Sequence, residues 1–227
     1  MSDPIRIGLV DDHGICADAV SILLEAELDM RVVWTAGDGE TAIERCREDA
    51  PDVVVMDVNL PGVNGIAATR QITAEHEHVK VLVVTGLSDP DLVARVVDAG
   101  ACGLLTKQRA GDDLVRDLRA AAGGSIVVPP QQMAALIDRL RAPAAERSPE
   151  TALTDREVEV LQGFADGLST GEVAERLFIS PRTVQGHVQS ILGKLRVRSK
   201  LEAVLYGLRH GIVQLRPVAD PPSRIGD

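Results

Sequence analysis

Five side chains with acidic, hydroxyl or basic groups stand at the ends of apolar, strand-like segments in the first half of the chain. Asp11 and Asp12 follow the first segment. Asp57 and Thr85 end the third and fourth, and Lys107 follows the fifth. The carboxyl ends of parallel strands lie at one edge of an open sheet, which is where such folds bind ligands. We therefore expect these five side chains to share one site.

The chemistry of this set points to phosphoryl transfer. Neighbouring carboxylates repel one another, by about 4 kcal/mol for each pair at 4 Å and an effective dielectric constant near 20. The set therefore calls for a cation, and oxygen ligands suit Mg²⁺. With Mg²⁺ and Lys107 holding a phosphoryl group, Asp57 would act as the nucleophile and form an acyl phosphate. Thr85 would then donate a hydrogen bond to the new phosphoryl oxygen, which makes the site a switch.

The elements that position this site alternate along the chain. Strands are predicted at 5–10, 31–35, 53–57, 79–85 and 103–106, and helices at about 14–27, 39–49, 64–76, 90–99 and 110–122. The strands are apolar almost throughout, as strands covered on both faces must be. This alternation predicts a doubly wound α/β domain with a parallel sheet.

The second half has a different pattern. After Gly123 and Gly124, a short helix is predicted at 131–141, and the Pro- and Ala-containing stretch at 142–150 is predicted to be a linker. Four helices follow, at about 155–166, 170–177, 181–194 and 200–210, and the first begins with a Thr154–Glu157 capping box. We divide the chain into residues 1–124, a linker at 125–150, an all-α domain at 151–213, and a tail at 214–227 predicted to be disordered.

Composition and charge narrow the classes of protein. The chain has a net charge of −10. Residues 1–147 hold 14 basic and 24 acidic residues, whereas residues 176–216 hold 8 basic residues and one acidic residue. A local excess of +7 favours a nucleic-acid partner for the second domain. Cys16, Cys46 and Cys102 lack metal-ligand spacing and are predicted to be buried free thiols, and no metal-like grouping of histidines is expected. No signal peptide or membrane span is predicted, so a cytoplasmic location is expected.

The first domain resembles the receiver domains of two-component response regulators. The resemblance covers residues 5 to about 122 and rests on VDDH at 10–13, MDVNLPGVNG at 56–65, VTG at 84–86 and AGACGLLTK at 99–107. It implies a flavodoxin-like five-stranded sheet of order 2-1-3-4-5. It also implies that a sensor histidine kinase phosphorylates Asp57. Asp12, Asp57 and the Asn59 carbonyl would then bind Mg²⁺ directly, and Asp11 would bind it through water.

One position departs from the receiver pattern. Receivers usually carry Tyr or Phe where this chain has Leu104, and that ring turns inward once the threonine engages the phosphoryl group. The coupling of phosphorylation to the rest of the molecule would therefore be weaker at Leu104, or would use another face of the domain.

The second domain resembles the LuxR-type helix-turn-helix over residues 153–212, in the arrangement of NarL/FixJ-type regulators. The matching positions include Thr154, Glu157, Gly167, Thr183 and Val184. The resemblance implies promoter binding as a homodimer, with the last helix supporting dimerisation on half-sites one DNA turn apart. In the helix at 181–194, Gln185 and Gln189 lie four residues apart and would reach base edges together.

The predicted DNA contacts extend beyond the two glutamines. Gly186 lies on the same face, and His187 lies between this face and the packing face. Phosphate contacts are predicted for Arg182, Thr183, Lys194, Arg198, Ser199 and Lys200.

The leading hypothesis is a transcription regulator in which phosphorylation of Asp57 shifts a balance between a closed form, with the recognition helix shielded, and an open dimer. One alternative is a phosphorylation-independent regulator whose receiver serves only for dimerisation. The other is an aspartate-nucleophile phosphohydrolase of the haloacid dehalogenase type. Such enzymes need a second aspartate two residues after the nucleophile, where this chain has Asn59. The chain is therefore expected to be no enzyme beyond slow self-dephosphorylation.

Overall fold

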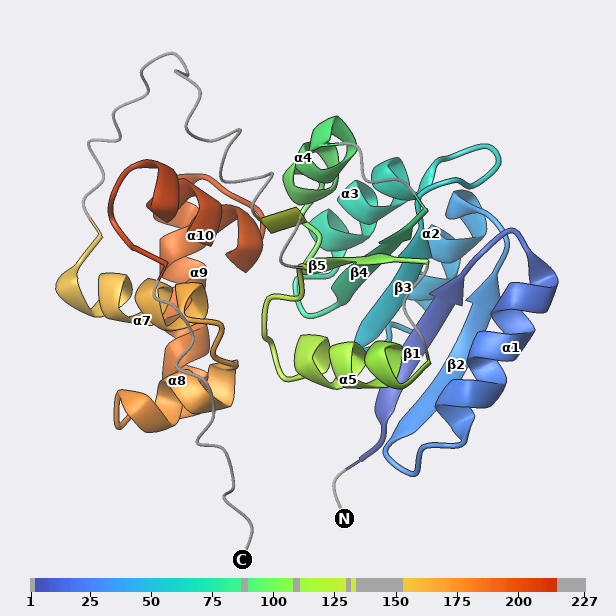
Figure 1. Ribbon diagram of the computed structural model, residues 1–227, viewed down its shortest axis with the longest axis horizontal. Coiled ribbons are helices and arrows are strands. Elements are labelled where there is room, and N and C mark those ends of the chain that lie inside the picture. Colours follow the sequence, from blue (N-terminus) through green and yellow to red (C-terminus); the bar gives the residue numbers. More distant parts are fainter. Residues whose placement is uncertain (1–2, 87–89, 108–110, 130–131, 134–152, 216–227) are drawn as a thin grey trace, which may run out of the picture.

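The computed structural model describes residues 3–86, 90–107, 111–129, 132–133 and 153–215 (Figure 1). The first domain alternates strands and helices: β1 (Ile5–Val10), α1 (Gly14–Glu25), β2 (Met30–Ala36), α2 (Gly39–Glu48), β3 (Val53–Asp57), α3 (Gly65–Glu75), β4 (Lys80–Thr85), α4 (Pro90–Asp98), β5 (Gly103–Thr106) and α5 (Gly111–Ala122). Parallel strands pair in the order β2-β1-β3-β4-β5. The predicted α/β architecture and strand order are confirmed.

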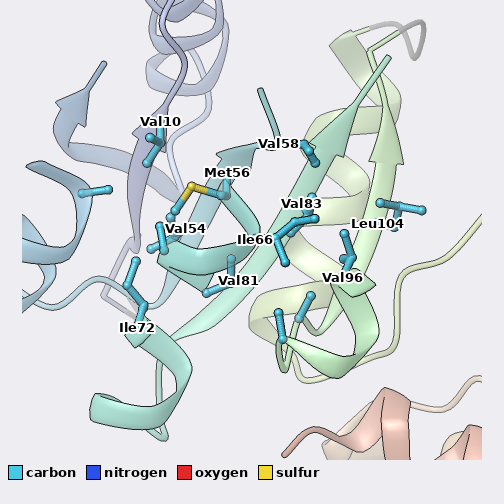
Figure 2. Packing of buried hydrophobic residues seen from close by; sticks show 14 of the residues in the cluster. Val10, Val54, Met56, Val58, Ile66, Ile72, Val81, Val83, Val96 and Leu104 are labelled. Atoms are coloured by element: carbon cyan, nitrogen blue, oxygen red, sulfur yellow. The ribbon is translucent and has the colours of Figure 1, made fainter. Parts of the chain in front are cut away.

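Two apolar layers cover the sheet. One cluster joins α1 and α5 to one face, with Leu24 and Leu118 fully buried. The other joins α2, α3 and α4 to the opposite face, and Figure 2 shows Met56, Val81, Val83 and other aliphatic side chains filling it. Because both faces are covered, every residue of β3 is buried.

The second domain is built from α7 (Asp155–Ala165), α8 (Thr170–Arg176), α9 (Pro181–Leu195) and α10 (Lys200–Arg209). The Thr154–Glu157 capping box is present, and Ser169 and Glu172 form a second one at α8. Ser180 caps α9, with Pro181 in its first turn. Val160, Phe164, Val184 and Ile191 are among the buried residues that form the core of this domain.

Two predictions need comment. The helix expected at 131–141 and the linker at 142–150 lie almost wholly outside the described residues, as does the tail beyond residue 215. Of the cysteines, Cys46 is buried, and burial raises the pKa of its thiol to about 12. Cys102 is half-buried and Cys16 is exposed. The prediction of a buried Cys16 is wrong because Cys16 lies on the solvent-facing side of α1, as does Ile15, which is 87 % exposed.

No helix within the described part of the chain is long and apolar enough to cross a membrane.

Candidate phosphoacceptor site and nucleic-acid interface

Asp57 lies at the carboxyl end of the central strand β3 and is only 2 % exposed. Its Oδ2 accepts a hydrogen bond from Lys107 Nζ at 2.5 Å, and its Oδ1 accepts one from the Asn59 backbone N–H at 3.2 Å. Lys107 Nζ also donates to Asp11 Oδ2 at 3.3 Å. The structure therefore brings together residues from three strand ends, as the sequence predicts, around one nearly buried carboxylate.

The charge of Lys107 is held in place by its neighbours. Partial burial by itself lowers the pKa of the Lys107 ammonium. The hydrogen bond and charge of Asp57, together with Asp11, outweigh that effect and raise the pKa overall. The lysine therefore stays protonated well above neutral pH and supplies a permanent positive charge beside Asp57.

Asp11, Asp12 and His13 form the acidic part of the site. One possible ligand atom from each residue lies within 4.8 Å of the other two. His13 Nδ1 is 2.8 Å from Asp12 Oδ1 and 3.4 Å from Asp11 Oδ1. The expectation that no histidine joins a metal-like group is thus wrong for His13. The sequence feature that could have identified His13 is its position directly after the two aspartates, since no second histidine lies at a metal-ligand spacing from it.

These residues fit a hard divalent cation. The Asp11 side chain is partly buried beside Lys107, whereas that of Asp12 is exposed to solvent. Carboxylate oxygens at the mouth of a site, with room for water, are the donors that Mg²⁺ prefers. The nearly buried Asp57 carboxylate contacts the same Lys107 ammonium group.

The loop after Asp57 is fixed by close backbone packing. Gly65 N–H donates to the Val58 carbonyl at 3.1 Å, which folds the loop back over the end of β3. A Cβ atom added at Gly65 would lie 1.8 Å from the Asp57 carbonyl oxygen, so only glycine fits there. The MDVNLPGVNG motif therefore has a local steric cause at its last residue.

Thr85 and Leu104 occupy neighbouring strands near this edge. Thr85 ends β4, is fully buried, and its carbonyl accepts a hydrogen bond from Lys107 N–H at 2.9 Å. Leu104 pairs with Val83 across β4 and β5 and is 1 % exposed. Figure 2 shows Leu104 in the apolar layer that contains Val83 and Val96. The position that carries an aromatic ring in receivers is therefore filled here by an inward-facing aliphatic side chain.

In the second domain, α9 has the two faces that its sequence predicts. Val184, Ile191 and Leu195 are buried in the core. Arg182, Thr183, Gln185, Gly186 and Gln189 are exposed, and His187 is half-buried between the two faces. An exposed polar face on a helix with a capped N-terminus fits the major groove of DNA.

Several residues predicted to contact phosphates have partners within the protein. Lys194 Nζ donates to Glu157 Oε2 at 2.6 Å, and Ser199 caps α10 by accepting from Glu202 N–H. Lys200 Nζ donates to the Gly124 carbonyl and, at 3.4 Å, to Thr170 Oγ1. Arg182 and Arg198 are exposed. The sequence placed all of these residues near α9 but could not identify these partners.

The two domains contact each other through α10 and the start of α8, and the recognition helix lines a cleft between them. Leu201 and Leu205 of α10 are buried in the same apolar cluster as α4 and Leu104. Gln189, Leu192 and Gly193 of α9 line a cleft that faces Lys80 and Arg70 of the first domain. Figure 1 shows α10 beside α4, with α9 behind it. Part of the face predicted to contact DNA is thus turned toward the first domain.

Comparisons with known proteins find a matching family for each of the two domains. The family described as "Response regulator receiver domain" matches residues 7–119, and "Bacterial regulatory proteins, luxR family" matches residues 151–206. The transcriptional regulatory protein LnrK of Bacillus subtilis is 34 % identical over 92 % of this chain and 98 % of its own length. DegU of Brevibacillus brevis is 35 % identical over 93 % of this chain and 96 % of its own.

Solved structures agree as well. The response regulator ChrA of a heme-sensing two-component system is 31 % identical, with a TM-score of 0.51, over 93 % of this chain and 100 % of that one. A structure of RcsB dimers bound to DNA is 25 % identical, with a TM-score of 0.54, over 90 % of this chain and 98 % of that one.

Proposed function

This chain belongs to the DNA-binding response regulators of two-component systems, with a receiver and a LuxR-type helix-turn-helix, and we propose that phosphorylation of Asp57 controls access of α9 to DNA. The single observation that carries this proposal is the geometry around Asp57. Its buried carboxylate contacts Lys107, which also contacts Asp11. A sensor histidine kinase is the expected phosphoryl donor.

Each residue of the site has a distinct role in this proposal. Asp11, Asp12, Asp57 and the Asn59 carbonyl would hold Mg²⁺, which when bound supplies charge neutralisation for the incoming phosphoryl group. The Asp57 carboxylate would attack the phosphorus as the nucleophile and form a P–O bond, while the P–N bond to the donor histidine breaks and the imidazole leaves. Lys107, already positively charged beside it, stabilises the added negative charge. Thr85 donates a hydrogen bond to a phosphoryl oxygen once the group is in place.

Apolar packing supports a route from this site to the DNA-binding domain. Leu104 adjoins the end of β4 and shares one apolar cluster with α4 and with Leu201 and Leu205 of α10. A shift of Thr85 toward a phosphoryl group would disturb this packing without an aromatic switch residue. We propose that loss of the contact between α4 and α10 releases α9.

The released form is proposed to bind promoter DNA as a homodimer. RcsB, which is similar to this chain, has been solved as dimers bound to DNA. Gln185, Gly186 and Gln189 are the proposed base contacts, and Arg182, Thr183 and Arg198 the proposed phosphate contacts, with His187 beside them. Lys194, Ser199 and Lys200 would contribute only if they exchanged their present partners for DNA phosphates.

The test is phosphorylation of the full chain by acetyl phosphate with Mg²⁺. Native protein, Asp57→Asn and the exposed-aspartate control Asp18→Asn are compared for labelling, for dimerisation, and for affinity to a DNA fragment selected from random sequences at one fixed salt concentration. We expect labelling, dimerisation and a rise in affinity for the native protein and for Asp18→Asn alone. Labelling of Asp57→Asn would refute the assignment of the acceptor.

The same experiment addresses the alternatives. Labelling with unchanged DNA affinity would favour a regulator that does not depend on phosphorylation. The leucine at position 104, where receivers usually carry an aromatic ring, is the feature that supports this alternative. Release of phosphate is proposed to be slow self-dephosphorylation, because Asn59 cannot serve as the general acid that a phosphohydrolase needs two residues after its nucleophile. Many turnovers per minute on small phosphomonoesters would contradict that proposal.

A further inference from the structure

The cleft between the two domains has a strongly basic lining. Its volume is about 660 Å³, within the range of sites for small molecules. Among the described residues that line the cleft, Glu77 is the only one with an acidic side chain. The cations come from both domains: Arg70, Lys80, Arg196, Arg198 and Lys200.

Among the described residues, four of these five cations lack the counter-charges that other cations have, and the exception is Arg198, which lies near the charge of Glu202. Lys107, Lys194 and Arg119, for example, each pair with a carboxylate. No side-chain ion pair within 4.0 Å is found for any of the five among the residues that the structure describes. The cleft therefore gathers positive charge that, within the described part of the chain, no carboxylate pairs with at 4.0 Å or less.

The surroundings of Lys200 show most clearly that positive charges of the cleft lack counter-charges. Its Nζ donates to the Gly124 carbonyl and to Thr170 Oγ1 and lies 4.6 Å from the centre of the Phe164 ring, so none of these partners carries a negative charge. Burial, and next the charge of Lys80, lower the pKa of Lys200 to about 8. Like charges from the two domains thus face each other across the cleft.

We propose that this cleft binds a small polyanion with two or more phosphate groups, of the class of inorganic pyrophosphate or a nucleoside polyphosphate, and that the bound anion holds the domains closed. One anion placed between Arg70 and Lys80 on the first domain and Arg196 and Lys200 on the second would turn mutual repulsion into attraction to a shared partner. Guanidinium and ammonium groups are the usual ligands of phosphate oxygens.

The effect on DNA binding follows from the same residues and rests on the proposed function. Gln189 and Arg196 line the cleft, and Gln189 is on the proposed reading face of α9. A ligand that bridges the cleft would favour the form in which this face is turned toward the receiver. The anion would therefore oppose release of α9.

The first test is titration of the full chain with inorganic pyrophosphate by calorimetry, without Mg²⁺ and at constant ionic strength. The double variant Arg70→Gln/Lys80→Gln removes only receiver cations, which are outside the proposed DNA contacts. The control Arg31→Gln/Arg95→Gln removes the same charge from receiver cations that do not line the cleft. We expect binding with one-to-one stoichiometry, weakened about tenfold or more in the first variant and unchanged in the control. Equal weakening in both variants, or no binding to the native chain, would overturn the proposal.

The second test measures DNA affinity with and without pyrophosphate. Pyrophosphate should lower the DNA affinity of the native chain several-fold more than chloride does at the same ionic strength. For Arg70→Gln/Lys80→Gln, pyrophosphate should lower the DNA affinity only as much as chloride does. If pyrophosphate acted by direct competition at α9, both proteins would respond alike, and the proposed clamp would be wrong. Calorimetry repeated on Asp57→Asn separates the cleft from the phosphoacceptor site. Pyrophosphate should bind this variant as tightly as it binds the native chain.

Discussion

At the scale of single residues, Leu104 and Leu105 stand next to each other on β5 but point into different layers. Leu104 belongs to the cluster with α4 and α10, and Leu105 to the cluster with α1 and α5. Both are nearly fully buried, so their truncation should remove similar packing energy. The pair therefore separates a loss of stability from a loss of signal.

We expect Leu104→Ala to label normally with acetyl phosphate but to lose most of the phosphorylation-dependent rise in DNA affinity. Leu105→Ala should keep that rise. Each truncation should lower the free energy of unfolding by about 3 kcal/mol, the ordinary cost of a leucine-sized cavity. The measurements are urea unfolding and DNA binding with and without acetyl phosphate. A full response in Leu104→Ala would exclude Leu104 from the coupling route.

Gly65 gives a second prediction at this scale. The Cβ of Gly65→Ala would overlap the Asp57 carbonyl oxygen, so the acceptor loop must move. We expect the rate of labelling by acetyl phosphate to fall about tenfold or more, because small misplacements of reacting groups are costly. Gly37→Ala is the matched control, since no heavy atom beyond its immediate chain neighbours lies within 4 Å of its added Cβ. An unchanged labelling rate in Gly65→Ala would show that the loop tolerates the shift.

At the scale of elements, Glu157 joins α7 to α9. Its carboxylate accepts from Lys194 Nζ at 2.6 Å, Ser190 Oγ at 2.5 Å and Thr154 N–H at 2.7 Å. Burial by itself raises the pKa of Glu157, but these three partners outweigh it and lower the pKa to about 2. The interaction holds the recognition helix on the first helix of its domain.

The lowered pKa of Glu157 determines how the stability of the second domain changes with pH. A carboxyl group whose pKa is about 2 when folded and 4.5 when unfolded stabilises the fold fully above pH 4.5, and that contribution is lost as the pH falls toward 2. We expect Glu157→Gln to destabilise the second domain by about 2 kcal/mol at pH 7. The difference from the native chain should shrink below pH 4.5. Thermal unfolding across pH measures it.

Glu159→Gln is the control for that experiment, because Glu159 makes only an exposed pair with Arg156. It should change stability by less than about 0.5 kcal/mol at any pH. Should Glu157→Gln behave like Glu159→Gln, the carboxylate would not be what fastens α9 to α7.

At the scale of the whole molecule, the contact between α4 and α10 includes a like-charge pair. Burial first, and then the nearby charge of Asp98 on α4, raise the pKa of Glu202 on α10. Asp98 and Glu202 belong to different domains. Their repulsion exists only while the domains are closed, so it weakens the closed form.

Asp98→Asn should therefore favour the closed form and lower the DNA affinity of the unphosphorylated chain by about threefold, the scale expected for an exposed pair of charges. Asp18→Asn, on the far side of the sheet in α1, should leave that affinity unchanged. The measurement is DNA binding at low and high salt, since screening should reduce the difference. A higher basal affinity in Asp98→Asn would contradict the shielding of α9 by domain contact.

The sequence by itself determined the elements and the composition of the site, and its resemblance to receiver domains implied the strand order. Alternating apolar segments fix a parallel α/β fold, and short motifs fix which side chains end its strands, because these signals are local in the chain. The Thr154–Glu157 capping box was predicted for the same reason.

Only the tertiary structure decided how the domains meet and which partners several basic side chains choose. Lys200 reaches a carbonyl 76 residues away, and Lys194 reaches a carboxylate 37 residues away. His13 lies beside the acidic pair, and Cys16 lies on the exposed side of α1. Such choices depend on which surfaces approach in three dimensions. Local periodicity carries no information about that approach.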